Sequence, residues 1–189
     1  MRVPLELRRA YKLLNHGPTT LVTSAAHGRT NVMSAAWVMP IDFEPPKVAV
    51  VIAEGTFTRE LVDASGEFTL CVPTRAQLEQ VYAVGSESGR DEDKWARSGL
   101  RPLPASKVGA PLVDGCVAWL ECRVLPESDV QRKYDLFLAE VVAAWADDVA
   151  WDAKENAWRF EDDASRTVHH LAGGVFFLTG ERVQAKKPG

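Results

Sequence analysis

Apolar residues recur along the chain with two different periods, which separate predicted helices from predicted strands. Near the start, Leu7, Tyr11 and Leu14 follow helical spacing with basic residues between them. This pattern predicts a short amphipathic N-terminal helix within residues 1–17. The Gly17-Pro18 pair ends it, because glycine suits the left-handed position after a helix and proline cannot continue one.

Most other apolar residues fall in short runs rich in β-branched side chains, which are typical of strands. His27 and Gly28 form a candidate hairpin turn between the first two runs. Pro45 and Pro46 are expected to lie outside the third run, because proline cannot donate a hydrogen bond to a ladder. The predicted strands are residues 19–25, 31–41, 47–53, 67–72, 113–124, 134–145 and 175–179, with a more exposed hairpin between Trp151 and Trp158.

Three further short helices are predicted between these strands. The first spans residues 56–64 and stops at Gly66, and the second spans residues 77–84. The third spans residues 91–97, with Ser88 and Asp91 spaced as a capping box and Gly99 as the stop. In the strand at 113–124, alternation predicts that Cys116, Ala118, Leu120, Cys122 and Val124 face inward while Val117, Trp119, Glu121 and Arg123 face outward.

About eight strands with short helices between them favour a closed or nearly closed antiparallel barrel. The chain has no Gly/Ser-rich or Pro-rich linker and no repeat, so residues 1–189 are expected to form a single domain. The acidic stretch at 147–163 is expected to be a solvated surface hairpin or loop. A calcium site is the alternative there, but the spacing does not fit an EF-hand loop.

Composition narrows the class of protein. The net charge is −4, from 22 basic and 26 acidic residues, which argues against nucleic-acid binding. No apolar run approaches the roughly 20 residues of a membrane helix or forms a signal peptide, so we expect a cytoplasmic protein without a membrane partner.

The cysteines, Cys71, Cys116 and Cys122, form no Cys-x-x-Cys pair and are expected to be buried. The four histidines lack metal-ligand spacing, so no metal site is expected.

Three segments carry more polar or small residues than their predicted elements require. Residues 23–37 are small where a buried hairpin should be bulky, which would let the backbone approach a flat ligand; close strand packing is the alternative. Residues 55–59 put threonines at a helix start, where free amides suit a phosphate; an ordinary threonine N-cap is the alternative. Residues 86–95 form a polar loop with Arg90 and Lys94, or else a capped surface helix.

Together these segments resemble the flavin reductase-like family of FMN-binding split barrels, the group that includes flavoredoxin. The resemblance runs from about Pro18 to Gly180. It is carried by Gly28-Arg29-x-Asn31-x-Met33-Ser34-x-Ala36-Trp37, Pro45-Pro46, Thr58-x-Glu60-Leu61, Gly66-Glu67-Phe68, Ser88-Gly89-Arg90-Asp91-x-Asp93-Lys94, Gly99-Leu100 and His170-Leu171-x-Gly173-Gly174. Each piece is short, and their order and spacing make the resemblance specific.

The resemblance implies a six-stranded antiparallel Greek-key split barrel that forms a homodimer, with FMN near the dimer interface. Residues from Asn31 to Trp37 would border the flavin ring, and His169 or His170 would sit at its open face. Relatives often carry a basic residue where Thr56 stands, and Arg59 could replace it. The implied cofactor-binding residues are Ser24, Asn31, Val32, Met33, Ser34, Ala35, Ala36, Trp37, Thr56, Thr58, Arg59, Ser88, Arg90, Lys94, His169 and His170.

The implied chemistry is hydride transfer from NAD(P)H to flavin, followed by transfer of electrons to an unidentified acceptor. The hydride step requires no protein acid or base, so no catalytic residue is nominated. Two alternatives remain open at this point. One is an FMN-bound electron carrier reduced by a protein partner, and the other is a binding barrel without flavin.

Overall fold

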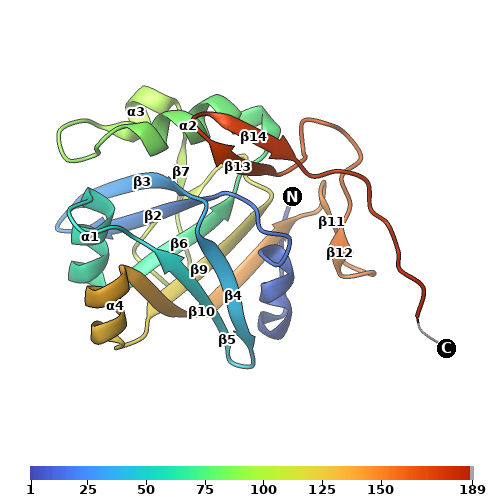
Figure 1. Cartoon of the computed structure of the whole chain (residues 1–189), viewed down its shortest axis with the longest axis horizontal. Coiled ribbons are helices and arrows are strands. Elements are labelled where there is room, and N and C mark those ends of the chain that lie inside the picture. Colours follow the sequence, from blue (N-terminus) through green and yellow to red (C-terminus); the bar gives the residue numbers. More distant parts are fainter. Residues whose placement is uncertain (188–189) are drawn as a thin grey trace.

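The computed structural model describes residues 1–187 and is built around one strongly curled antiparallel sheet (Figure 1). The strands are hydrogen-bonded in the order β3-β2-β6-β9-β10-β5-β4, and β1 pairs with β10. β3 and β4 stand at opposite ends of this order, yet only Ala36 and Trp37 join them. The sheet must therefore bend back on itself. The predicted antiparallel split barrel is confirmed, but its sheet has eight strands rather than the expected six, counting the short β1. Its strands are β1 (Arg2–Pro4), β2 (Thr20–Ala26), β3 (Arg29–Ala35), β4 (Val38–Phe43), β5 (Pro46–Val51), β6 (Glu67–Val72), β9 (Ala118–Val124) and β10 (Leu136–Asp147).

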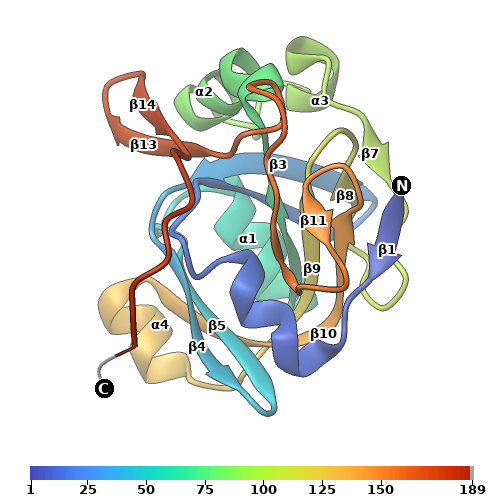
Figure 2. The ribbon, with the colours of Figure 1, turned by 90° about the vertical axis from the view of Figure 1, so that its right-hand side faces the viewer.

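Short elements cover the two faces of this sheet. The two hydrophobic clusters include Leu70 on one side and Leu21 on the other, both fully buried. In both views α2, α3 and the β13–β14 hairpin lie together beside β3 (Figures 1 and 2). The smaller elements are η1 (Leu7–Leu13), α1 (Phe57–Ser65), η2 (Arg75–Gln77), α2 (Leu78–Ser86), α3 (Lys94–Ser98), β7 (Pro102–Leu103), β8 (Leu112–Val113), α4 (Ser128–Tyr134), β11 (Trp151–Asp152), β12 (Ala157–Trp158), β13 (Val168–Ala172) and β14 (Val175–Leu178).

Local sequence signals place several elements correctly. His27 and Gly28 both have positive φ, and they form the two-residue turn between β2 and β3. Thr56 is the N-cap of α1, and Gly66 ends the same helix in the left-handed conformation. Gly99 ends α3 in the same way. The three cysteines are free and buried, as expected.

Other boundaries differ from the prediction because tertiary pairing overrides local pattern. The N-terminal helix is a 3₁₀ helix, and residues 2–4 before it form β1 rather than helix. The predicted strand at 31–41 is two strands, because the chain turns at Ala36-Trp37 to join opposite ends of the sheet. Asp93, rather than the predicted Ser88 and Asp91, caps α3 by accepting from the amides of Trp95 and Ala96.

The later half of the chain also departs from the prediction. The predicted strand at 113–124 is shortened by a turn at Asp114-Gly115, and α4 and β13 were not predicted. Pro46 is the first residue of β5 rather than outside it, which is tolerated because a strand end needs no amide donor there. Trp151 pairs with Trp158 as expected, but the Trp151 side chain is buried rather than exposed.

Glu121 is a further correction, because this carboxylate is fully buried although alternation placed it on an outward face. The loop that follows β7 covers that face of β9. There the backbone amides of Ser106 and Lys107 donate to the two carboxylate oxygens of Glu121. A buried carboxylate is tolerated because both oxygens are hydrogen-bonded.

None of the helices within residues 1–187 combines the length and the apolar character that crossing a membrane requires.

Candidate functional site

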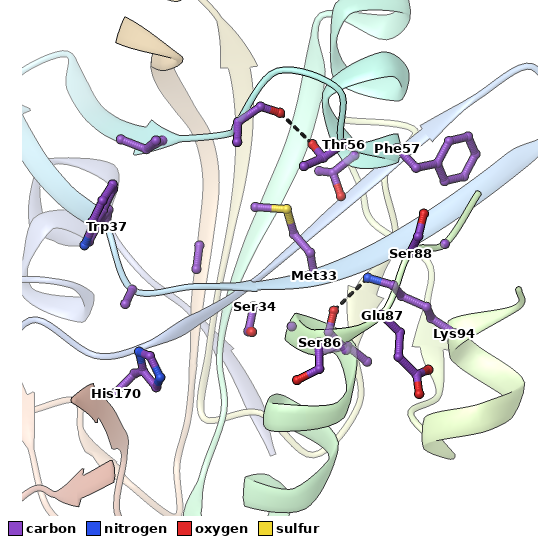
Figure 3. A pocket seen from close by; sticks show the side chains of 18 of the residues that line it. Met33, Ser34, Trp37, Thr56, Phe57, Ser86, Glu87, Ser88, Lys94 and His170 are labelled. Atoms are coloured by element: carbon purple, nitrogen blue, oxygen red, sulfur yellow. Dashed lines mark hydrogen bonds between the residues drawn. The ribbon is translucent and has the colours of Figure 1, made fainter. Parts of the chain in front are cut away.

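A cavity of about 830 Å³ lies beside β3, where four segments distant in sequence meet. Its walls are β3 itself, the start of α1, the end of α2 with the loop after it, and the β13 end of the C-terminal hairpin. Figure 3 shows Trp37 and His170 at one side of this cavity and Thr56, Ser88 and Lys94 at the other. Its volume is in the range of cofactor-sized sites. The hairpin of small residues and the threonine-tipped helix start, predicted separately, therefore converge on one pocket.

Two glycines let the α2 end and the following loop press against β3. A β-carbon placed on Gly85 would lie 2.1 Å from Ser34 Oγ, and one on Gly89 would lie 2.0 Å from Asn31 Oδ1. Neither distance is possible between real atoms, so any side chain at these positions would push the wall away from the strand. The small residues on β3 and the facing glycines thus set the width of the cavity together.

The α1 end of the cavity is rich in unpaired donors. Thr56 Oγ1 accepts from the amide of Arg59, while the amides of Phe57 and Thr58 have no hydrogen bond within residues 1–187. Such first-turn amides and the positive end of the helix dipole favour an anion. The Thr58 hydroxyl is buried here and accepts a 2.8 Å hydrogen bond from Asn31 Nδ2, which ties β3 to the helix start.

Lys94 places a buried ammonium group in the same wall. Only 5% of the residue is exposed, and Nζ donates to the carbonyl oxygen of Val84 at 2.7 Å. Within residues 1–187 no salt bridge involves this lysine. Burial lowers the pKa of Lys94 to about 8, and the nearby charge of Glu87 partly opposes that shift. A desolvated ammonium without a bonded carboxylate is well suited to an anionic ligand.

A short loop, residues 87–91, crosses this end of the cavity and is fastened at three points. Arg90 Nη1 pairs with Glu60 Oε2 at 2.5 Å, and Arg90 Nη2 donates to the carbonyl oxygen of Gly55 at 3.3 Å. Arg29 Nη2 donates to the carbonyl oxygens of Gly89 and Arg90. The third point is the close packing of Gly89 on the Asn31 amide. We call residues 87–91 the strap.

The structure brings most of the predicted site residues to the cavity. Those that line it are Asn31, Met33, Ser34, Ala35, Ala36, Trp37, Thr56, Thr58, Ser88, Lys94 and His170. Trp37 is 75% exposed, so it forms part of an open rim rather than a packed wall. Whether these residues hold a cofactor stays a prediction.

Five predicted residues do not line the cavity. Val32 is buried in the cluster behind β3, and Ser24 is buried on β2 with a hydroxyl that has no partner within residues 1–187. Arg59 turns away from the cavity to Asp63 and Asp135, over the ring of Phe137. Relatives often carry a basic residue at position 56, and the expectation that Arg59 takes over its role has no support in the geometry.

The other two lie close to the cavity but point elsewhere. Arg90 fastens the strap from outside. His169 faces the opposite side of the β13–β14 hairpin, where Nδ1 donates to the carbonyl oxygen of Gly17. Adjacent residues on a strand point to opposite faces, so only one of the two histidines could reach the cavity.

Sequence reasoning did not nominate a further set of wall residues, most of which are apolar or glycine. They are Val51, Ala53, Gly55, Phe57, Val84, Gly85, Ser86, Glu87, Gly89, Leu171, Ala172 and Gly173. Several of them stand in segments that the sequence analysis singled out: Gly55 and Phe57 in residues 55–59, and Ser86, Glu87 and Gly89 in residues 86–95. Leu171 and Gly173 stand inside a quoted motif. Gly89 has no positive φ that would require glycine. A glycine of this kind is the one signal that could have indicated the close approach of the loop to β3.

The cavity fits a planar group carrying a phosphate. One end offers two free helix amides and a buried ammonium, which suit a dianion. Between the two ends the wall consists of small side chains and backbone on β3, which allow a flat ring to lie close. The donor set and the glycine-dependent width are both features of the folded structure rather than of a sequence motif.

Comparison with known proteins gives concordant results. Residues 14–161 match the model of the flavin reductase like domain. The uncharacterized protein YddH of Escherichia coli K12 is 47% identical over 186 residues, covering 97% of each chain.

Solved structures give the same result. A crystal structure of an FMN-binding domain of a flavin reductases-like enzyme from Shewanella baltica is 42% identical, with a TM-score of 0.95 over 98% of each chain. Flavoredoxin of Desulfovibrio vulgaris (Miyazaki F) is 26% identical, with a TM-score of 0.79 over 89% of this chain and 90% of its own.

Proposed function

Because the chain belongs to the flavin reductase-like family, we propose that it binds FMN in this cavity and acts as an NAD(P)H-dependent oxidoreductase. Flavin binding is a property of the family. The location of the flavin in this cavity and the use of NAD(P)H as the electron donor are what we add. The observation that carries the proposal is the meeting of a helix N-terminus, a buried lysine and a wall of small residues in one cavity of about 830 Å³.

The anion-binding end would hold the phosphate. The amides of Phe57 and Thr58 and the ammonium of Lys94 supply the donors, and the Asn31–Thr58 hydrogen bond keeps the helix start in place. Two of these are neutral amides and one is a charge in a desolvated site, so the charged group contributes the larger share of the affinity. Ser88 on the strap adds a hydroxyl at the same end.

The other end would hold the flavin ring. Met33, Ser34 and Ala35 of β3 present backbone and small or flexible side chains, while Trp37 and His170 border the opening. Bound flavin supplies the redox chemistry, accepting a hydride from a nicotinamide and releasing electrons afterwards. The chain would bind and orient the flavin and leave one side of the ring open for the electron donor.

We further propose that the active form is a homodimer. β4 is an edge strand, and Met39, Ile41 and Phe43 alternate along it with exposed side chains. Trp37 continues this row to the rim of the cavity. A row of exposed apolar residues on an edge strand is an aggregation hazard unless a partner covers it. A second copy seated on β4 would bring its own residues next to the open end of the site.

The test is anaerobic stopped-flow mixing of the FMN-loaded protein with NADH and, separately, with NADPH. The proposal expects rapid loss of the visible absorption of oxidised flavin with at least one of them. Bound FMN that neither nucleotide bleaches would reject the reductase and leave the electron carrier reduced by a protein partner. A protein that binds no FMN in equilibrium dialysis would reject both.

A further inference from the structure

Arg59 turns away from the cavity, yet its side chain is bonded behind the helix start that would hold the phosphate. Only 11% of this side chain is exposed. Nε donates to Asp63 Oδ2 at 2.9 Å, one turn further along α1, and Nη1 donates to Asp135 Oδ1 at 3.1 Å, at the end of α4. The guanidinium also lies 4.6 Å from the ring centroid of Phe137 on β10. Together these partners fix the planar guanidinium in one place.

Two further hydrogen bonds of Arg59 enclose the segment that carries the free amides. Its backbone amide donates to Thr56 Oγ1 at 3.2 Å, and its side-chain Nη1 donates to the carbonyl oxygen of Ile52 at 3.1 Å. Ile52 is the first residue after β5, so this second bond reaches back across the whole loop that leads into α1. The amides of Phe57 and Thr58 therefore lie between two points that the same residue holds.

The loop between β5 and α1 needs such a link to the sheet. Residues 53–55 are exposed. The amide and the hydroxyl of Thr56 both donate to the carbonyl oxygen of Ala53, which closes a local turn but does not attach the loop to β5. The side chain of Arg59 supplies the attachment, because it runs from the first turn of the helix to Ile52 at the end of the strand.

We infer that Arg59 is a positioning residue for the phosphate of the cofactor, which holds the first-turn amides of α1 where the phosphate would meet them. Asn31 ties the same helix start to β3 through Thr58, and Arg59 ties it to β5 and α4. The inference rests on the proposed function, because it assigns a role in binding FMN in the same cavity. It replaces the direct contact with phosphate that the sequence predicted for this arginine.

Geometry rather than charge defines this role. The guanidinium is already paired with the carboxylates of Asp63 and Asp135, so its charge is not free for a phosphate. A lysine would keep the positive charge. It could not keep the arrangement, because an ammonium is a single point of donors and cannot reproduce the planar fork that bonds to several segments at once. Arg59→Lys therefore separates position from charge.

The test compares FMN with riboflavin, which has the same ring system and no phosphate. Fluorescence titration gives the dissociation constant of each flavin, and wild type is expected to bind FMN more tightly than riboflavin. Arg59→Ala and Arg59→Lys should each weaken FMN binding at least tenfold and change riboflavin binding less than twofold. Guanidinium ions, well below the concentration that unfolds the protein, should restore FMN affinity to Arg59→Ala, whereas an equal concentration of sodium chloride should not.

The matched control is Arg166→Ala. Arg166 also pairs with a carboxylate, that of Asp163, and donates to a backbone carbonyl, that of Thr179, but it lies outside the cavity. Its replacement should leave the ratio of FMN affinity to riboflavin affinity unchanged. If Arg59→Ala does not fold, Arg59→Lys carries the test. An Arg59 variant that keeps the wild-type ratio, including one that loses both flavins equally, would overturn the inference. Wild-type protein that binds neither flavin would instead count against the proposed function.

Discussion

The buried side chain of Lys94 is unfavourable for stability and favourable for binding an anion. Its ammonium is desolvated and hydrogen-bonded only to a backbone carbonyl. Its pKa in the folded protein is about 8, so below that pH the charged side chain lowers the stability of the ligand-free protein. The same charge is what a phosphate in the cavity would need. A residue that is unfavourable for stability and well placed for a ligand is typical of a binding site.

The first prediction concerns FMN affinity and pH. A bound phosphate stabilises the ammonium of Lys94, so the FMN dissociation constant should rise as pH increases through about 8. Lys94→Met should weaken FMN binding about tenfold below that pH, roughly 1.4 kcal/mol, and remove this pH dependence. Fluorescence titration of FMN well below and well above pH 8 measures both effects.

The control for this prediction is Lys12→Met. Lys12 Nζ also donates to a backbone carbonyl, that of Asn156, but lies outside the cavity. Its replacement should leave FMN binding unchanged.

The stability of the Lys94→Met variant gives a second readout. Because the buried charge is removed, Lys94→Met should also unfold at higher denaturant concentration than wild type near neutral pH. An unaltered FMN titration curve for Lys94→Met would place the phosphate elsewhere.

At the scale of elements, the C-terminal hairpin is held to the N-terminal segment by a histidine pair. His16 Nε2 lies 3.1 Å from Thr167 Oγ1, and the His16 ring lies 5.6 Å from the ring of His169. Nδ1 of His16 is buried without a partner within residues 1–187, so this half-buried residue is accommodated with a neutral ring. Burial, together with the charge of His169, lowers the pKa of His16 to about 4.

The second prediction follows from that shift. Between pH 6.5 and about 4 the unfolded chain binds a proton at position 16 that the folded chain does not, so stability falls as the pH is lowered through this window. The loss approaches about 3 kcal/mol. His16→Gln should flatten this part of the curve in urea unfolding experiments. A wild-type curve that is already flat there would contradict the account of His16.

The third prediction concerns the strap. Arg90 joins it to Glu60 and Gly55, but the pair is half exposed, so its contribution is modest. Arg90→Ala should speed FMN dissociation roughly twofold to fivefold, an effect that high salt should reproduce in wild type. Stopped-flow displacement of FMN gives the rate. Arg101→Ala, which breaks an exposed pair with Asp114 away from the cavity, should have no effect.

Elements defined by local chemistry were predictable from the sequence, and those defined by distant pairing were not. The His27-Gly28 turn and the caps of α1 carry their own conformational signals. The break after Ala35 has no glycine or proline to mark it, because it is imposed by closure of the sheet. The burial of Glu121 depends on a loop whose position local alternation cannot encode. The cavity was predictable as two converging segments, whereas its glycine wall was not.

At the scale of the whole molecule, the exposed row on β4 gives the fourth prediction. The wild-type protein should sediment as a dimer, because Met39, Ile41 and Phe43 otherwise leave an apolar edge in water. Met39→Asp should shift it toward the monomer in analytical ultracentrifugation. Val149→Asp, at an exposed apolar residue outside β4, is the matched control. A wild-type monomer, or a dimer indifferent to Met39→Asp, would remove β4 as the interface.

The central claim is that one cavity, between β3 and the start of α1, receives the whole cofactor. The most direct measurement is a crystal structure of the FMN-loaded protein. The account predicts phosphate oxygens within hydrogen-bonding distance of the Phe57 and Thr58 amides and of Lys94 Nζ, with the ring against Met33–Ala35. FMN bound outside this cavity, or with its phosphate at the Trp37 and His170 side, would contradict it.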